Sequence, residues 1–511
     1  MITPFQSLRP RSVNRPVLLA LTGAGLFLAS LDAYVVVTAI LPMLTSVHVP
    51  VNHLERATPI ITGFLLGYLA VMPLAGGLSD RFGRLRLFTA CLVVFAIGSL
   101  VTATAGTLSQ LVTGRLVQGA GGGALVPIVL ALAADLYPAG TRSPVLGAVS
   151  ALQEIGSVLG PLWGGVVATS LGWNWIFWLN LPLAALLIWA VWPEVRAVKE
   201  ARRPANVDWL GAVLAAAALA LLTLALYATD PEKSPVGSNF LWQAPLALLL
   251  VALFAWHERR SPHPLLDVRY FRDSSFAGAA ITNAVAGAGL MIALVFIPVL
   301  AESPFVFSPS MNPSQAAWLL FRLMLGIPIG ALLGGFLAHR LRSYRVVAAA
   351  GMLLAAAGFL LLSGWNERSL QPHLLGLPLR VADAQLILIG LGLGLEIAPV
   401  SAAVLDAVGE AQRGAGASVL IVMRLLGMLV GFSLVAGYGL YQFHQATAHL
   451  LPPLPTLLPD FAIRYATYVL HVREALLAEY RLVFQSTGIA LIVGAGIAAV
   501  TLRPMARARW R

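Results

Sequence analysis

Long apolar stretches alternate along the chain with short segments that hold the charged and turn-forming residues. A helix that crosses a membrane needs roughly 20 apolar residues. The pattern therefore predicts an all-α polytopic membrane protein with fourteen transmembrane helices. They are expected at about 17–43, 58–79, 86–105, 109–133, 143–169, 174–193, 207–228, 241–257, 275–301, 316–338, 346–363, 384–407, 414–442 and 482–503.

Composition excludes several other classes of protein. Of the 511 residues, 59% are apolar and 11% are charged, whereas a soluble domain carries about 25% charged residues. This excludes a soluble enzyme, a disordered chain and a nucleic-acid binder. Cys91 is the single cysteine, so neither an internal disulfide nor a cysteine-based metal centre is expected. The sequence shows no nucleotide-binding loop and no metal-ligand spacing, so we expect no cofactor, no metal and no enzymatic activity.

The distribution of Lys and Arg predicts the orientation in the membrane. With both termini in the cytoplasm, 23 of the 33 basic residues fall in inner segments, seven in outer segments and three within spans. Basic residues concentrate in cytoplasmic loops. An even number of spans with both termini inside is therefore expected.

An internal repeat predicts how the spans are grouped. Segments 76–86 and 335–345 share Leu, Arg and Arg at a constant offset of 259. We therefore expect two six-helix halves, 1–193 and 273–511, separated by an inserted helix pair within 194–272. Paired halves of this kind are typical of secondary transporters. Helical spacing after a proline-rich segment also predicts that the last two helices extend outside the membrane, over about 441–481.

Five motifs resemble those of the major facilitator superfamily, and in particular its fourteen-helix drug:proton antiporter branch. The loop Gly76–Arg86 is similar to the G-x-L-a-D-R-x-G-R signature of that superfamily. Arg115–Gly119 is similar to its R-x-x-Q-G motif, and Gly156–Gly165 to its antiporter motif. Segments 31–42 and 173–182 resemble hallmarks of the fourteen-helix branch.

Within that branch, segments 153–162, 390–395 and 424–429 resemble a group of mycobacterial triacylglyceride exporters that work with a periplasmic lipoprotein. The resemblance implies proton-driven export of neutral lipid across a bacterial inner membrane, with drug efflux as an associated activity. It also implies an outer hairpin at about 365–383 and a lipoprotein carrier as partner. Glu396 departs from the pattern, because no acid is expected at that position.

Asp32 and Glu154 are the candidate proton-coupling residues. Each lies within a predicted span, where a carboxylate costs about 2.5–3.5 kcal/mol on insertion scales. Because desolvation favours the neutral form of an acid, such a group is suited to carry a proton. The alternative is an acid that is locked to a partner for structure.

Arg115 and Gln118 are candidate charge partners. They lie three residues apart and so share a helix face, and the guanidinium stays charged in a protein. We expect Arg115 to pair with Asp32 or Glu154 when that acid is deprotonated, or else to serve as a fixed scaffold.

The second half holds a different set of charges within its spans. Arg424 is the candidate counterpart of Arg115, and Glu396 is its candidate partner in a structural pair. Arg322, near the start of its span, is expected to extend its charged end to the outer interface.

The loop after the second span is the candidate cytoplasmic gate. It contains Asp80, Arg81, Gly83 and Arg84, and alternating access requires bonds that close one face and break on rocking. Simple anchoring by basic residues is the alternative.

A glycine face is predicted on the fifth span. Gly156, Gly160 and Gly164 recur every four residues, so they share one side of the helix and let a second helix approach closely. Together with Pro161 and Gly165, they are expected to pack helices rather than to contact a ligand.

Three functions fit these observations. The first is a proton-coupled exporter of neutral lipid, the second a polyspecific drug:proton antiporter, and the third a transport-inactive membrane scaffold. The scaffold has no use for charges inside spans, and a small drug needs no extended outer helices. Lipid export is therefore preferred, with membrane lipids, a lipophilic substrate and protons as partners of a monomeric protein.

Overall fold

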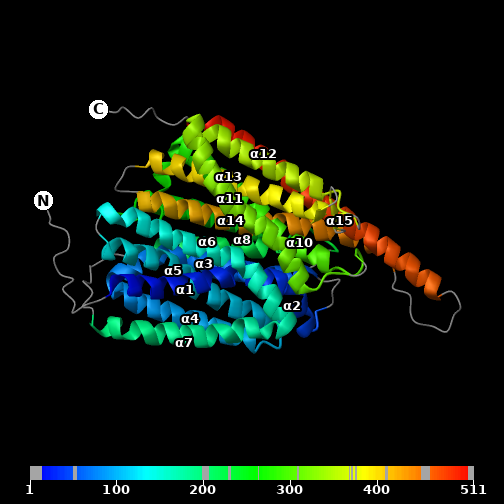
Figure 1. Cartoon of the computed structure of the whole chain (residues 1–511), viewed down its shortest axis with the longest axis horizontal. Helices are drawn as coiled ribbons and strands as arrows, with labels where there is room; N and C mark the ends of the chain where they lie inside the picture. Colours follow the sequence, from blue (N-terminus) through cyan, green and yellow to red (C-terminus); the bar gives the residue numbers. More distant parts are fainter. Residues whose placement is uncertain are drawn as a thin grey trace. The chain divides into compact units, whose positions relative to one another are not determined.

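The computed structural model describes residues 14–49, 54–137, 139–197, 207–227, 232–262, 264–307, 310–366, 369, 372–374, 377–408, 413–450 and 461–503. Most of these residues form α-helices (Figure 1). The helices are α1 (Arg15–Val35), α2 (Ile40–Ser46), α3 (Thr58–Phe82), α4 (Arg84–Ala103), α5 (Leu108–Leu136), α6 (Ala139–Ser170), α7 (Asn174–Ala197), α8 (Trp209–Leu226), α9 (Phe240–Glu258), α10 (Ser274–Glu302), α11 (Pro313–Leu341), α12 (Tyr344–Leu362), α13 (Val381–Ala407), α14 (Arg413–Thr447) and α15 (Phe461–Thr501).

Fourteen of these helices are long and apolar enough to cross a membrane. Only α2, with seven residues, is too short to count. The predicted all-α polytopic class with fourteen spans is confirmed.

The first span differs from the continuous helix predicted at 17–43. Helix α1 ends at Val35, a 3₁₀ turn covers Val36–Thr38, and α2 continues to Ser46. The run of β-branched residues at the break has low helix propensity. In addition, the Thr38 hydroxyl donates a hydrogen bond of 2.7 Å to the carbonyl of Pro161 on α6, which holds the turn against a neighbouring helix.

The chain divides into two compact units. Unit 1 comprises Met1–Val51, Pro59–Leu221 and Pro245–Asp267, and unit 2 comprises Asn52–Thr58, Leu222–Ala244 and Val268–Arg511. In unit 1, α1 packs on α6, and α4 packs on α5 and α7. In unit 2, α10 packs on α14 and α15, and α13 packs on α11 and α12. The inner faces of these helices bury side chains such as Phe95, Phe177, Phe276 and Phe359.

Glycines allow close contact between helices in unit 1. A Cβ atom at Gly156 would lie 2.7 Å from the carbonyl oxygen of Phe27, and one at Gly160 would lie 2.5 Å from that of Leu31. Any larger residue would push α6 away from α1, because real side chains do not approach so closely. Gly164 faces the Val35 carbonyl in the same way.

Two features of unit 2 lie where the sequence predicts segments outside the membrane: a hairpin before α13 and the start of α15. Strands β1 (Pro372–Leu374) and β2 (Leu377–Arg380) form an antiparallel hairpin that leads directly into α13. Helix α15 has 41 residues and is therefore about 60 Å long, roughly twice the thickness of the hydrocarbon core. Figure 1 shows its Phe461 end projecting past the ends of its neighbours in unit 2. Part of the predicted extension, residues 451–460, lies outside the described residues.

Candidate functional site

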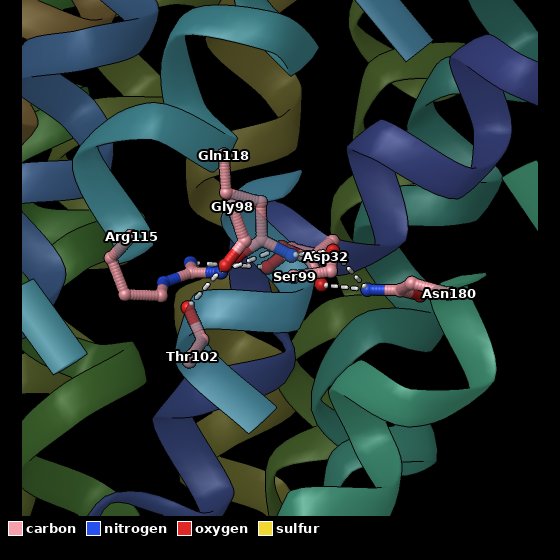
Figure 2. A network of polar contacts seen from close by, with 7 residues as sticks. All are labelled: Asp32, Gly98, Ser99, Thr102, Arg115, Gln118 and Asn180. Atoms are coloured by element: carbon pink, nitrogen blue, oxygen red, sulfur yellow. Dashed lines mark hydrogen bonds and ion pairs between the residues drawn. The ribbon is translucent and has the colours of Figure 1, made fainter. Parts of the chain in front are cut away.

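Four helices of unit 1 bring polar side chains to one buried position (Figure 2). Helix α1 contributes Asp32, α4 contributes Ser99, α5 contributes Arg115 and Gln118, and α7 contributes Asn180. Each of these side chains is at most 3% exposed. We call these five residues the Asp32 network.

An ion pair forms the centre of the Asp32 network. Arg115 Nη1 lies 2.6 Å from Asp32 Oδ2, and Nη2 donates a hydrogen bond of 3.3 Å to the Asp32 carbonyl. The same Nη1 donates to Gln118 Oε1 at 2.6 Å. Of the two acids considered as partners of Arg115, the structure therefore pairs it with Asp32.

One further hydrogen bond satisfies the second carboxylate oxygen of Asp32, and another connects Gln118 to Ser99. Asn180 Nδ2 donates to Asp32 Oδ1 at 2.8 Å, and Gln118 Nε2 donates to Ser99 Oγ at 2.8 Å. Breaking one partner out of a buried pair costs about 3–5 kcal/mol, because the remaining charge is left without compensation. The Asp32 carboxylate is thus stable in the membrane only while this network is intact.

Aromatic rings cover the guanidinium. The Cζ atom of Arg115 lies 4.1 Å from the ring centroid of Phe64 on α3 and 5.8 Å from that of Phe177 on α7. Arg115 Nε has no hydrogen-bond partner among the described residues. A desolvated cation over a ring gains about 2 kcal/mol, which helps to hold Arg115 in place beside Asp32.

Glu154, the second predicted proton-coupling residue, lies apart from the Asp32 network. Its side chain is on the exposed face of α6 within unit 1. It interacts electrostatically with Tyr68 of α3, and the described residues offer it no ion pair. The two predicted acids therefore occupy different environments.

Glu396 and Arg424 lie on neighbouring helices of unit 2. Glu396 on α13 is 1% exposed, and its Oε2 atom has no hydrogen-bond partner in the described part of the chain. Arg424 on α14 interacts electrostatically with this carboxyl. Unlike Asp32, this acid is buried with an unsatisfied oxygen.

The predicted gate residues meet an acid that the sequence did not indicate. Gly83 has a φ of +97°, which favours glycine, and it makes the sharp turn from α3 to α4. Arg84 then pairs with Asp80 at 3.4 Å and with Asp135, at the end of α5, at 2.7 Å. Arg81 lies beside the ring of Phe82, 5.5 Å from its centroid. The loop is thus tied to α5 by Arg84.

Arg322, which the sequence predicts to extend its charged end to the interface, forms an ion pair within unit 2. Its Nε lies 3.0 Å from Oδ1 of Asp383 in the first turn of α13. Asp383 also accepts a hydrogen bond of 3.0 Å from the backbone N–H of Arg380 at the end of β2. This pair joins α11 to the hairpin.

Several residues of these sites were missed in the sequence. Asn180 and Ser99 complete the Asp32 network, and Asp135 pairs with the predicted gate residue Arg84. For Asn180 and Ser99 the available signal was an uncharged polar residue within an apolar span, because such residues are costly in a membrane unless they are bonded.

Known proteins similar to this chain share its fold and most of its length. The Major Facilitator Superfamily profile matches residues 22–432. A triacylglyceride transporter of Mycolicibacterium smegmatis is 38% identical over 497 residues, which cover 94% of this chain and 86% of that protein. The triacylglyceride transporter of Mycobacterium tuberculosis is 38% identical, with 94% and 93% covered.

Solved structures show the same fold at low sequence identity. A peptide transporter of the POT family superposes with a TM-score of 0.64 at 18% identity, and covers 96% of this chain and 98% of its own. A D-xylose–proton symporter superposes with a TM-score of 0.58 at 13% identity, with 96% and 98% covered. The chain belongs to the Major Facilitator Superfamily and is a multi-pass membrane transporter, not an enzyme.

Proposed function

We propose that this transporter exports a neutral lipid of the triacylglyceride class from a bacterial inner membrane, driven by protons and by alternating access. Relatives that are named triacylglyceride transporters match 94% of the chain at 38% identity, which supports the substrate class. The charge distribution supports cytoplasmic termini.

The observation that carries the proposal is the fully buried ion pair between Asp32 and Arg115. A proton that binds Asp32 Oδ2 removes the negative charge that holds Arg115, because the guanidinium itself does not titrate. The pair therefore has two arrangements: an ion pair when Asp32 is ionised, and a separated pair when Asp32 is protonated. Such a two-state element can link proton binding to a rearrangement of α1 against α5.

Glu154 and the gate support the remaining steps. Glu154, an acid on the exposed face of α6, is the second proposed proton-coupling residue. Arg84 ties the α3–α4 turn to α5 through Asp135, and breaking this pair is the proposed step that opens the cytoplasmic end.

The length of α15 supports a lipid rather than a small drug as substrate. Exposing acyl chains to water costs about 0.8 kcal/mol per CH₂ group, so a triacylglyceride needs an apolar path or a carrier. The projecting part of α15 exposes Ile463, Tyr465 and Leu470, each at least 50% accessible. These residues offer such a path, with a periplasmic lipoprotein as the proposed carrier.

Transport between proteoliposomes tests the proposal. Wild-type protein should move labelled triacylglyceride faster with a pH gradient than without one. Asp32→Asn should still insert and fold, with a lower thermal stability because Arg115 loses its counter-charge, and should lose the response to the gradient because the amide cannot titrate. Glu154→Gln should also lose the response. Asp406→Asn, an acid outside the Asp32 network, is the control. A gradient response in Asp32→Asn equal to that of the wild type would contradict the assignment.

A second experiment separates lipid from drug. Replacing residues 446–478 by a short Gly/Ser linker should leave the core helices inserted and strongly reduce lipid export, whereas efflux of a small drug should survive better. Unchanged lipid export would favour the drug:proton antiporter. Equal loss of both activities would indicate that the extension serves folding.

A further inference from the structure

Glu396 is the most deeply buried acid of unit 2 that the proposed mechanism does not use. It lies in the middle of α13, is 1% exposed, and leaves Oε2 without a hydrogen bond among the described residues. An ionised oxygen in this position loses its hydration without compensation, which is costly. The group therefore needs either a proton or a cation.

Backbone atoms fill the space around the residue. Gly334 of α11 lies against the carbonyl of Leu395, and a Cβ atom at Gly351 of α12 would lie 3.0 Å from the Glu396 nitrogen. Within residues 390–399, Glu396 has the only side-chain oxygen. A metal cation prefers several oxygen ligands, so this environment suits a proton and not a metal.

Few charged groups face the Glu396 carboxyl from the helices that pack on α13. Arg424 of α14 interacts with it electrostatically. On α11 the nearest titratable residue is His339, five positions beyond Gly334. On α12 it is Arg345, six positions before Gly351 and so about 9 Å away along the helix axis. Helix α10 has no charged residue from 274 to 301. Arg424 is therefore the cation that can compensate an ionised Glu396.

Helix packing holds Arg424 in place. Its carbonyl and the first part of its side chain lie against Gly287 of α10, where a Cβ atom would be 3.1 Å from Arg424 Cγ. On the same helix pair, Asn283 Nδ2 donates to the Leu420 carbonyl at 2.7 Å. The guanidinium thus starts from a fixed point of the α10–α14 contact.

We propose that Glu396 is a second proton-binding site of the transporter, located in unit 2. The carboxyl alternates between a neutral acid and a carboxylate compensated by Arg424. A proton from one aqueous side binds the carboxylate, and the same proton leaves to the other side when Arg424 takes over the compensation. This inference rests on the proposed proton-coupled function and adds a carrier to it.

Infrared spectroscopy of the purified full-length protein in lipid nanodiscs tests the site without transport. The carbonyl stretch of protonated carboxylic acids is recorded during a pH titration of wild type, Glu396→Gln and Asp32→Asn. The proposal expects a titrating band that disappears in Glu396→Gln and persists in Asp32→Asn. A spectrum of Glu396→Gln identical to that of the wild type at every pH overturns it, and indicates a permanent ion pair with Arg424.

Arg424→Gln provides a variant that keeps the acid. The Glu396 band should be present and should persist to higher pH than in the wild type, because the carboxylate has lost its cation. If Glu396→Gln does not fold, this shift alone decides: a band at the wild-type position in Arg424→Gln overturns the proposed alternation.

Transport measurements separate failure of this inference from failure of the proposed function. The number of protons per lipid in proteoliposomes should fall in Glu396→Gln, while exchange of labelled lipid at equal pH on both sides continues. An unchanged proton number with a lost infrared band overturns the carrier role. If wild-type lipid transport does not respond to a pH gradient, the proposed function fails, whatever the infrared result.

Discussion

The two units use the same helix contact but place their charges differently. In unit 1, Gly156 and Gly160 of α6 lie against Phe27 and Leu31 of α1. In unit 2, Gly427 and Gly431 of α14 lie against Ala284 and Ala288 of α10. Both contacts repeat every four residues, as expected for two helices that approach through one small-residue face.

The acids of unit 1 have no counterpart at the matching positions of unit 2. Asp32 directly follows Leu31, whereas Gly289 follows Ala288. Glu154 lies two positions before Gly156, and Leu425 lies two positions before Gly427. Packing and chemistry are thus separable: the backbone contact is a property of the fold, and the charges are specific additions to it.

The ends of the helices differ in a similar way. Arg84, at the start of α4, forms an ion pair with Asp135 at the end of α5. Tyr344, at the start of α12, donates a hydrogen bond of 2.9 Å to Asp406 at the end of α13. The turn in unit 1 is therefore held by two opposite charges, whereas the equivalent turn in unit 2 is held by one charged and one neutral group.

Loss of Arg115 should have the largest effect. In Arg115→Gln the Asp32 carboxylate is buried without a cation, so the free energy of unfolding should fall by about 3–5 kcal/mol and lipid transport should be abolished. Thermal unfolding of the purified variant measures this. The double variant with Asp32→Asn should regain most of the stability but not the response to a pH gradient. A single variant as stable as the wild type would show that the pair is not structural.

Removing Asn180 should have a smaller effect on the same network. Asn180→Leu leaves Asp32 Oδ1 without its donor, and a hydrogen bond to a charged group contributes about 1.5–3 kcal/mol. Asn174→Ala on the same helix is the matched control, because the hydrogen bond that Asn174 donates goes to the neutral carbonyl of Ala103. Thermal unfolding of the two variants should separate them, and equal losses would argue against a special role of Asn180.

Glycine substitutions test whether the two helix contacts are equivalent. Gly160→Ala and Gly427→Ala each place a methyl group against a backbone carbonyl, on Leu31 and Ala284 respectively. Such overpacking costs about 1–3 kcal/mol, and thermal unfolding should show a similar loss for both. Gly147→Ala is the control, since a Cβ atom there meets nothing within 4 Å. Loss in only one variant would break the comparison between the units.

Variants at the two helix turns should lose the least stability, and the two losses should depend differently on salt. Asp135→Asn removes a partly exposed ion pair that contributes about 0.2–1 kcal/mol, so its effect on stability should shrink at high ionic strength. Tyr344→Phe removes a hydrogen bond, and its effect should change little with salt. Thermal unfolding at low and high salt measures both. The same salt dependence in both variants would contradict the assigned difference.

Local features of the sequence determined the class of the protein. Fourteen apolar stretches of sufficient length predict fourteen spans, since a spanning helix satisfies its backbone hydrogen bonds internally. The four-residue glycine spacing predicted the close face of α6, and charges within spans singled out Asp32 and Arg115. These inferences succeed because length, periodicity and hydropathy act within one helix.

The tertiary structure alone decided which of these residues meet. Arg115 and Asp32 are 83 positions apart, and Asn180 and Asp32 are 148 apart, so their contacts depend on how α1, α5 and α7 pack. The partners of Arg84 and Arg322, and the unsatisfied oxygen of Glu396, also follow from packing. A hydrogen bond needs heavy atoms within about 3 Å, and no local pattern specifies the distance between separate helices to that accuracy.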